Sequence, residues 1–295
     1  MTNGSTRPSP DMNAKPSLIA RGWPHLILLP VCAVLMMPIA WLIIAAFKTN
    51  ADFFATLFFP VDANGVLDLG RLTTASFGRL FGRESFHRAF FNSVFLSSAL
   101  AAIGTLGAAA GGYALARLRF HGSTPVTILV LGLLVIPPPL LLAPTYELMH
   151  NLGLLDNYLA VILPGLAPAF AVFLFRQSTM QSVPKELIEA SRIDGLGEIG
   201  IFANVALPLL RPMIGAMMLV MFLGMWNNFI GPQVFLHSPE KMPLAVAVAN
   251  LKGTYYTEYG LQMAATLLAV APVLILFLLL QRDFVSGLAS GAVKG

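Results

Sequence analysis

The sequence predicts an all-α integral membrane protein with six transmembrane helices, and two observations support this class. Only 11% of the 295 residues are charged and 57% are hydrophobic, whereas soluble domains have roughly 25% and 45–50%. A soluble enzyme is therefore excluded. The charges also leave six long charge-free windows, and a helix of about 20 apolar residues crosses the hydrocarbon core. The windows are residues 22–47, 89–116, 120–146, 157–175, 212–239 and 259–281.

These windows divide the chain into an N-terminal tail (1–24), a six-helix transmembrane domain (25–281) and a C-terminal tail (282–295). The spans are expected at about 25–47, 89–113, 125–148, 158–176, 212–232 and 260–281. The first hydrophobic segment is too long, and lacks the cleavage site, for a removed signal peptide. The single cysteine, Cys32, excludes an intrachain disulfide.

The distribution of Lys and Arg favours a cytoplasmic N-terminus and a cytoplasmic C-terminus. In that orientation the inner segments carry 11 of the 18 basic residues, in line with the excess of Lys and Arg on cytoplasmic loops. The five basic residues of segment 48–88 run against this rule, but Arg117 and Arg119 follow the second span and residues 149–157 contain none. The basic residues form no stripe with interleaved aromatics, so the pI near 9.4 indicates topology rather than nucleic-acid binding.

Three segments have distinctive compositions. Segment 48–88 mixes aromatic, turn-forming and charged residues, which predicts short helices on the outer membrane surface. The second span is rich in Gly and Ala, which favours close helix packing over a pathway-lining role. The third span contains Pro137, Pro138, Pro139 and Pro144. Because broken backbone at membrane depth lies against protein or a water-filled cavity, this span is either a wall of a transport pathway or a kink needed for packing.

Several kinds of chemistry are missing from the sequence. No Gly-rich phosphate loop occurs, so we expect the chain to hydrolyse no ATP and to bind no cofactor itself. The five histidines are scattered, and neither a metal site nor a catalytic residue is predicted. The spans also lack the charged residues on which ion-coupled carriers depend. Uphill transport would therefore take its energy from a partner protein.

The polar loop of about residues 182–208 carries signals for two short helices. Ser182 can cap the first helix and Pro184 suits its first turn, while Gly195 supplies a left-handed stop. A second helix is expected at about 197–205. One face of the first helix should carry Leu187, Ala190 and Ser191. Such a helix pair either rests on lipid headgroups or docks a soluble partner.

The spacing within this loop resembles the EAA loop of ABC importer permeases. The family pattern is Glu-Ala-Ala, three residues, Gly, nine residues, Ile, one residue and Leu-Pro. The matching residues here are Glu189, Ala190, Ser191, Gly195, Val205, Leu207 and Pro208. Ser191 replaces Ala and Val205 replaces Ile, and every spacing is kept.

Four further segments resemble the carbohydrate-uptake branch, the class of the maltose permease subunits. They are Phe91-Asn92-Ser93, Gly112 to Arg117 with Phe120, Leu152 to Asn157, and Gly287-Leu288 with Gly291 to Gly295. The resemblance covers roughly residues 25–295. It implies a type I ABC importer permease fold in the cell membrane and translocation of a mono- or oligosaccharide, with ATP hydrolysed by partner subunits.

The resemblance also implies partners and contacts. The partners are a second permease subunit in a heterodimer, two ATP-binding-cassette ATPase subunits and an extracytoplasmic solute-binding protein. The residues expected to couple to the ATPase are Glu189, Ala190, Ser191, Asp194, Gly195, Leu207 and Pro208. Glu189 is expected to pair with a basic residue of the ATPase.

A sugar pathway needs amide and aromatic groups rather than charges. Trp226, Asn227 and Asn228 in the fifth span supply such groups, and Pro138 and Pro139 could open the third span beside them. Packing is the alternative role, because Trp is common at membrane interfaces and Asn joins helices by hydrogen bonds. The rival functions are an ABC permease for another solute, such as a polyamine or phosphate ester, an ion-coupled carrier or channel, and a membrane scaffold.

Overall fold

The computed structural model describes residues 18–62, 64–252 and 258–292, and this part of the chain is helical, with one isolated β-bridge. Four of its helical segments are long and apolar enough to cross a membrane: His25–Ala46, Ser85–Arg117, Tyr158–Ser182 and Tyr259–Leu278. Two bent helix pairs raise the number to six when each pair counts as one span. The predicted all-α, multi-span class is therefore confirmed.

The spans are built from a few long helices and several broken ones. They are α1 (Leu18–Ala46), α4 (Glu84–Arg117), α5 (Ser123–Leu133), α6 (Leu142–Asn151), α7 (Tyr158–Ile162), α8 (Ala169–Ser182), α12 (Arg211–Trp226) and α15 (Tyr259–Ala292). The connecting elements are α2 (Asn50–Ala55), η1 (Leu69–Arg71), α3 (Ala75–Phe81), η2 (Pro138–Leu141), η3 (Leu163–Gly165), α9 (Lys185–Ile193), α10 (Glu198–Ile201), η4 (Phe202–Ala206), α11 (Leu207–Leu209), α13 (Ile230–Phe235), η5 (Pro239–Lys241) and α14 (Leu244–Asn250). Helix α15 covers most of the expected C-terminal tail, and the expected tail 1–24 lies largely outside the described residues.

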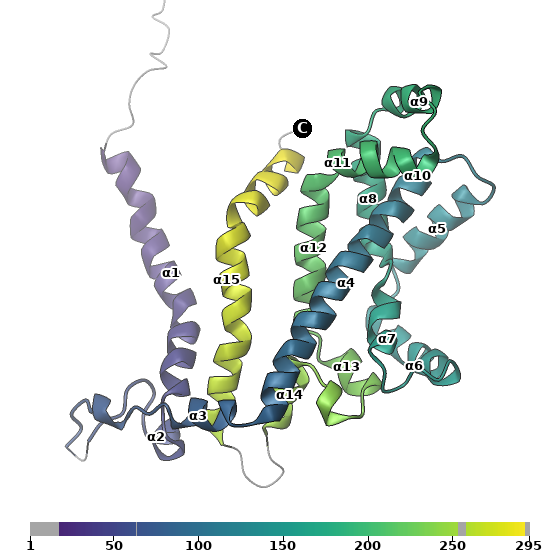
Figure 1. Cartoon of the computed structure of the whole chain (residues 1–295). Coiled ribbons are helices and arrows are strands. Elements are labelled where there is room, and N and C mark those ends of the chain that lie inside the picture. Colours follow the sequence, from purple (N-terminus) through teal and green to yellow (C-terminus); the bar gives the residue numbers. More distant parts are fainter. Residues whose placement is uncertain (1–17, 63, 253–257, 293–295) are drawn as a thin grey trace, which may run out of the picture.

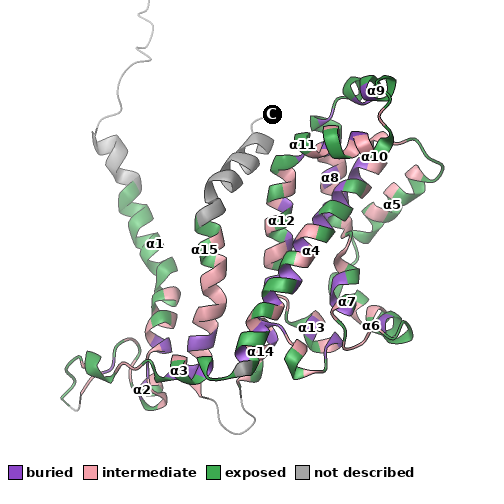
Figure 2. Cartoon of the chain, viewed as in Figure 1, coloured by how far each residue is buried: buried purple, intermediate pink, exposed green. Residues whose placement is uncertain are grey.

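Helix α4 is the centre of the bundle and packs against α8 and α12, whereas α1 packs along α15 (Figure 1). The beginning of α1, the end of α15 and α9 lie at one end of the molecule, and α2, α3, α13 and α14 lie at the other. Colouring by burial shows α1 exposed along most of its length (Figure 2). This helix therefore offers most of its apolar surface to lipid or to another chain.

The glycines of α4 allow the backbone of α8 to approach closely. A Cβ atom on Gly112 would lie 2.5 Å from Cβ of Phe175, and one on Gly107 would lie 2.6 Å from the carbonyl oxygen of Leu166. Real Cβ atoms do not approach so closely, so only glycine fits at these positions. Apolar burial does not drive helices together in lipid, and close packing of their backbones takes its place. The small residues of the second span thus serve packing.

The third predicted span is broken rather than continuous. Its two halves, Ser123–Leu133 and Pro138–Asn151, meet at an angle of 109°. Prolines lack the N–H that continues a helix, and here Pro137 precedes η2, which begins with Pro138 and Pro139. The side chains of these prolines are exposed, so the break faces outward from this chain.

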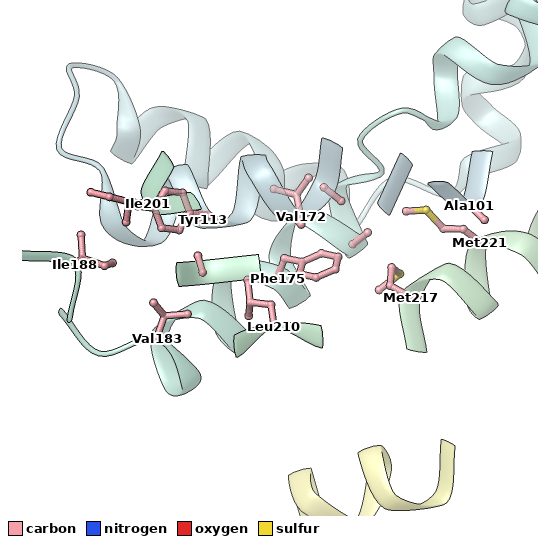
Figure 3. Packing of buried hydrophobic residues seen from close by; sticks show 14 residues of the cluster. Ala101, Tyr113, Val172, Phe175, Val183, Ile188, Ile201, Leu210, Met217 and Met221 are labelled. Atoms are coloured by element: carbon pink, nitrogen blue, oxygen red, sulfur yellow. The ribbon is translucent and has the colours of Figure 1, made fainter. Parts of the chain in front are cut away.

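One hydrophobic cluster joins the helices of the bundle to the loop after α8 (Figure 3). Tyr113 of α4, Phe175 of α8 and Ile188 of α9 belong to it, together with Ile201 and Leu210. All five side chains are at most 3% exposed. The polar loop is therefore packed onto the bundle as part of its core.

Candidate functional site

Helix α9 is the central element of the candidate coupling site, and its C-terminal stop has the predicted conformation. Gly195 has φ of +87°, a region that glycine adopts at little cost. Its N–H donates to the carbonyl of Arg192 at 3.0 Å, and the N–H of Leu196 donates to the carbonyl of Ser191 at 3.0 Å. This pair of bonds is a Schellman motif, which turns the chain sharply at the end of α9.

The start of α9 differs from the prediction. Ser182 is the last residue of α8, and Pro184 occupies the position before Lys185 with no side-chain cap. The predicted Ser182 cap is therefore wrong. The helix ends at Ser182 because the residue before a proline is driven out of the α region, and Val183 is indeed extended, with φ of −113° and ψ of 101°.

Two residues of α9 are buried against the bundle. Ile188 and Ser191 are 2% and 7% exposed, and the Ser191 hydroxyl donates to the carbonyl of Leu187 at 2.8 Å. Leu187 and Ala190 are exposed. Of the three residues predicted to share one face, only Ser191 is buried, and Ile188, which pairs with it at i, i+3, completes the buried side.

The opposite side of α9 is a solvent-exposed surface with an unusual apolar residue. Glu186, Ala190 and Ile193, at i, i+4 and i+7, share this side, and Ile193 is 86% exposed. On α10, Ile199 is 85% exposed. Large apolar side chains so exposed at the tip of a loop suit contact with a partner protein.

The seven predicted coupling residues divide between this surface and the core. Glu189, Ala190, Asp194 and Gly195 are exposed around the end of α9. Ser191 is buried, Leu207 packs against the hydrophobic cluster, and Pro208 is exposed on α11. The structure therefore brings the first four together at the surface and uses Ser191 and Leu207 to anchor the loop.

The expected second helix is an irregular segment rather than one α-helix. A turn of α10 leads into the π-helical element η4, in which the N–H of Leu207 donates to the carbonyl of Phe202. Pro208 has no N–H to continue the α-helical ladder, and the whole segment meets α12 at 84°. The result is a rigid arm that runs across the end of the bundle.

Polar contacts join α4 to the end of α8, and α9 to this arm. The Arg117 guanidinium donates to the carbonyls of Thr179 at 3.1 Å and Met180 at 3.2 Å, and also to the carbonyl of Val183. Arg192 and Glu198 form an ion pair at 2.7 Å between α9 and α10. The chain that leads into α9 is thereby bonded to the end of α4.

A second polar network lies at the opposite end of the bundle and joins segments that carried the resemblance. The Asn92 amide donates to the carbonyls of Glu240 at 2.8 Å and Met242 at 3.1 Å, and the Tyr158 hydroxyl donates to Asn92 at 2.9 Å. The hydroxyl of Ser93 accepts from the N–H of the residue that begins α14. Asn92 and Ser93 are therefore structural residues that hold the segment before α14.

Asp156 is the centre of the same network. Its carboxylate accepts from the backbone N–H groups of His237 and Ser238, both at 2.9 Å, from the Ser238 hydroxyl, and from Lys241 at 2.8 Å. Hydrogen bonds to the charged form, above all those from Lys241 and Ser238, hold the pKa of Asp156 well below its usual range. The next residue, Asn157, caps α7 through the N–H of Leu159.

The predicted pathway residues lie where α12 ends. Trp226 is 3% exposed, and its indole N–H donates to the carbonyl of Ala269 on α15 at 3.0 Å. The Asn227 amide donates to the carbonyl of Leu223, and the Asn228 side chain accepts from the N–H of Gly231. These bonds end α12 and begin α13, so the fifth span is shorter than the expected 212–232.

A small pocket of about 230 Å³ adjoins two of these residues. Trp226 and Asn227 line it together with Thr266 and apolar residues of α14 and α15. Asn228, Pro138 and Pro139 are not among its lining residues. The described chain thus brings Trp226 and Asn227 together at one pocket and keeps the proline break apart from it.

The helical bundle defines a multi-span membrane protein, with an exposed helix pair, α9 and α10, at one end. The family described as "Binding-protein-dependent transport system inner membrane component" matches residues 103–289. The chain belongs to this family. It is therefore a multi-pass membrane subunit of a binding-protein-dependent ABC importer, without an ATPase site of its own.

Several relatives and one solved structure resemble the chain over most of its length. It is 36% identical over 269 residues to the arabinooligosaccharides transport system permease protein AraQ of Halalkalibacterium halodurans, covering 90% of this chain and 93% of that protein. The lactose transport system permease protein LacG of Rhizobium radiobacter is 30% identical over 259 residues, covering 88% and 91%. A bacterial ABC transporter involved in import of the acidic polysaccharide alginate has a similar fold, with a TM-score of 0.76 at 20% identity over 92% of this chain and 99% of that chain.

Proposed function

We propose that this subunit imports a sugar and that α9 transmits the movement of an ATPase to the transmembrane helices. The relatives named above transport arabinooligosaccharides and lactose, which supports a mono- or oligosaccharide as the solute. The observation that carries the coupling role is the combination of an exposed outer side of α9 with a buried inner side fixed to the bundle by Ile188 and Ser191. The outer side is free to bind while the inner side moves with the spans.

The ATPase-binding surface consists of Glu189, Ala190, Asp194 and Gly195, with the exposed Ile193 beside them. Ala190 has a small side chain that permits close approach. Glu189 forms no ion pair within the described residues, and we expect it to pair with a basic residue of the ATPase. Two ATPase subunits hydrolyse the ATP, and a solute-binding protein delivers the sugar to the opposite end.

The proposed orientation places both chain termini in the cytoplasm. The beginning of α1, the end of α15 and α9 lie at the same end of the bundle (Figure 1), so a cytoplasmic ATPase would put all three inside. The second permease subunit would form a heterodimer with this one. The exposed proline break between α5 and α6 supplies an outward-facing wall on which such a subunit could meet the pathway.

Cysteine cross-linking in intact membranes tests the coupling role. In a Cys32→Ser background, Ala190→Cys should form a cross-link to an ATPase subunit with a short bifunctional reagent. Ser191→Cys is the matched control, because Ser191 is the next residue but is buried against the bundle. Failure of Ala190→Cys to capture the ATPase under conditions in which the importer is active would contradict the proposal.

A further inference from the structure

A large pocket lies on the inner side of α9 and shares one residue, Glu189, with the proposed ATPase-binding surface. Its volume is about 780 Å³, within the usual range for small-molecule sites. Arg117, Arg119 and Phe120 line one wall, at the end of α4 and in the connection to α5. Lys185 and Arg192 line the other wall. The pocket therefore separates the end of a transmembrane helix from α9.

Apart from Glu189, the helical spacing of α9 puts the pocket lining and the docking surface on different sides of the helix. Lys185, Ile188 and Arg192, at i, i+3 and i+7, form one stripe of the helix and all line the pocket. Ala190 and Ile193 belong to the exposed stripe on another side of the helix. A partner that binds Ala190 and Ile193 would leave the pocket open.

The charges in the pocket are unbalanced. Arg192 is neutralised by Glu198 at 2.7 Å. Arg117 bonds only to backbone carbonyls, and its Nε is buried without a hydrogen-bond partner. Arg119 and Lys185 are exposed, and neither forms an ion pair within the described residues. Glu189 is then the one lining carboxylate left beside these three cations, and under the proposed function it pairs with the ATPase instead.

We propose that this pocket binds a phosphate-bearing anion, supplied in the membrane by the headgroup of an anionic phospholipid. Arginine and lysine donors suit phosphate oxygens, and basic pockets at the cytoplasmic ends of spans bind such headgroups. Arg117 is the last residue of the span Ser85–Arg117, so the pocket opens at headgroup depth. The apolar side chain of Phe120 can contact the glycerol and upper acyl chain. The cytoplasmic placement rests on the orientation given under the proposed function.

Lipid retention by the assembled importer tests this site. The complex is reconstituted into nanodiscs of phosphatidylcholine with increasing phosphatidylglycerol, and retained lipid is measured by native mass spectrometry. The wild type should retain phosphatidylglycerol in preference to phosphatidylcholine. Arg119→Gln and Lys185→Gln should each weaken this retention about fivefold, since one basic residue contributes ~1 kcal/mol near an anionic membrane surface.

The matched control is Arg211→Gln, which removes an exposed cation at the start of α12, at the same end of the bundle (Figure 1) but outside the pocket lining. This variant should retain phosphatidylglycerol like the wild type. Equal losses in Arg211→Gln and Arg119→Gln would overturn the proposal, because they would indicate attraction to surface charge in general. Absence of any preference in the wild type would overturn the headgroup as the source.

A second arm distinguishes the two sources of phosphate. Glycerol 1-phosphate is titrated calorimetrically into importer held in pure phosphatidylcholine nanodiscs. One outcome is that the wild type binds glycerol 1-phosphate, Arg119→Gln does not, and the wild type retains no phosphatidylglycerol. This outcome would support the anion site and assign it to a soluble phosphate compound. Binding of neither probe would overturn the site. The cross-link from Ala190 is measured on the same preparations, so failure of the coupling role is distinguishable from failure of this site.

Discussion

The guanidinium of Arg117 at the end of α4 donates a hydrogen bond to the carbonyl oxygen of Val183, which precedes the turn into α9. This bond joins residues 66 positions apart. It gives a charged donor to a carbonyl at the end of α8, where the carbonyl groups have no hydrogen-bond partner within the helix. Because Val183 itself is 1% exposed, water does not replace the donor. Arg117 therefore fixes the base of the proposed coupling element.

Replacement of Arg117 should loosen that base. Arg117→Ala leaves buried carbonyl groups without their donor, which costs about 1–3 kcal/mol, and should lower the unfolding temperature of the purified importer in lipid-free detergent. ATP hydrolysis should continue with reduced sugar uptake, since the link between α9 and α4 is weakened. Arg119→Ala, at an exposed neighbour, should change stability by less than about 0.5 kcal/mol. Equal unfolding temperatures for both variants would contradict this role of Arg117.

Two adjacent glycines of α4 provide a matched test of helix packing. Gly112→Ala would place Cβ 2.5 Å from Cβ of Phe175, whereas Gly111→Ala would place it 3.6 Å from the nearest atom, on Val172. Overpacking costs typically about 1–3 kcal/mol, while Ala in place of Gly in a helix gains up to about 1 kcal/mol. We expect Gly112→Ala to lower the thermal stability and Gly111→Ala to maintain or raise it. The same shift in both variants would show that α8 does not approach α4 at Gly112.

The sequence was sufficient for features that depend on composition or on a single backbone conformation. The low charge content and its charge-free windows predicted the all-α, multi-span class, and the position of Gly195 predicted its left-handed conformation. The buried side of α9 could not be read in the same way, because the helix is short and polar and its orientation is set by tertiary contacts with Tyr113 and Ile201. The interruption of the fifth span after Trp226 also escaped prediction, since α12 ends at Asn227 and Asn228, several residues before Gly231 and Pro232.

The network around Asp156 predicts a pH-dependent stability. A carboxylate with a depressed folded-state pKa stabilises the fold above its unfolded pKa, which is about 3.9, and this contribution disappears as the pH falls through the folded value. Asp156→Asn should therefore be less stable than the wild type at pH 7 and approach it as the pH falls below about 4. Unfolding temperatures measured from pH 7 to pH 3 check this. Glu147→Gln, at an exposed carboxylate of α6, should keep the wild-type profile.

The pocket beside Asn227 predicts a change in solute handling without a change in fold. Asn227→Ala removes an amide that lines the pocket, and we expect slower sugar uptake or altered sugar preference in membrane vesicles. Asn228→Ala is the comparison, because Asn228 does not line the pocket and accepts a bond from Gly231 instead. Trp226→Phe loses the hydrogen bond to Ala269, so its main effect should be a lower stability of the fold. Unchanged uptake and preference in Asn227→Ala would remove this pocket from the pathway.

Gly195 allows two explanations of its role to be separated by experiment. No atom lies within 4 Å of the position of an added Cβ, so within this chain the requirement for glycine is the backbone φ of +87°. A non-glycine residue in that region costs roughly 1–2 kcal/mol, and Asn tolerates it best.

If the turn alone matters, sugar uptake should decline in the order Gly, Asn, Ala and Val, with ATPase association retained in Gly195→Asn. If the ATPase also packs directly on Gly195, then Gly195→Asn should lose association as fully as Gly195→Asp. Co-purification of the ATPase with each variant, compared with membrane insertion of the subunit, distinguishes the two outcomes, and full uptake by Gly195→Val would exclude both.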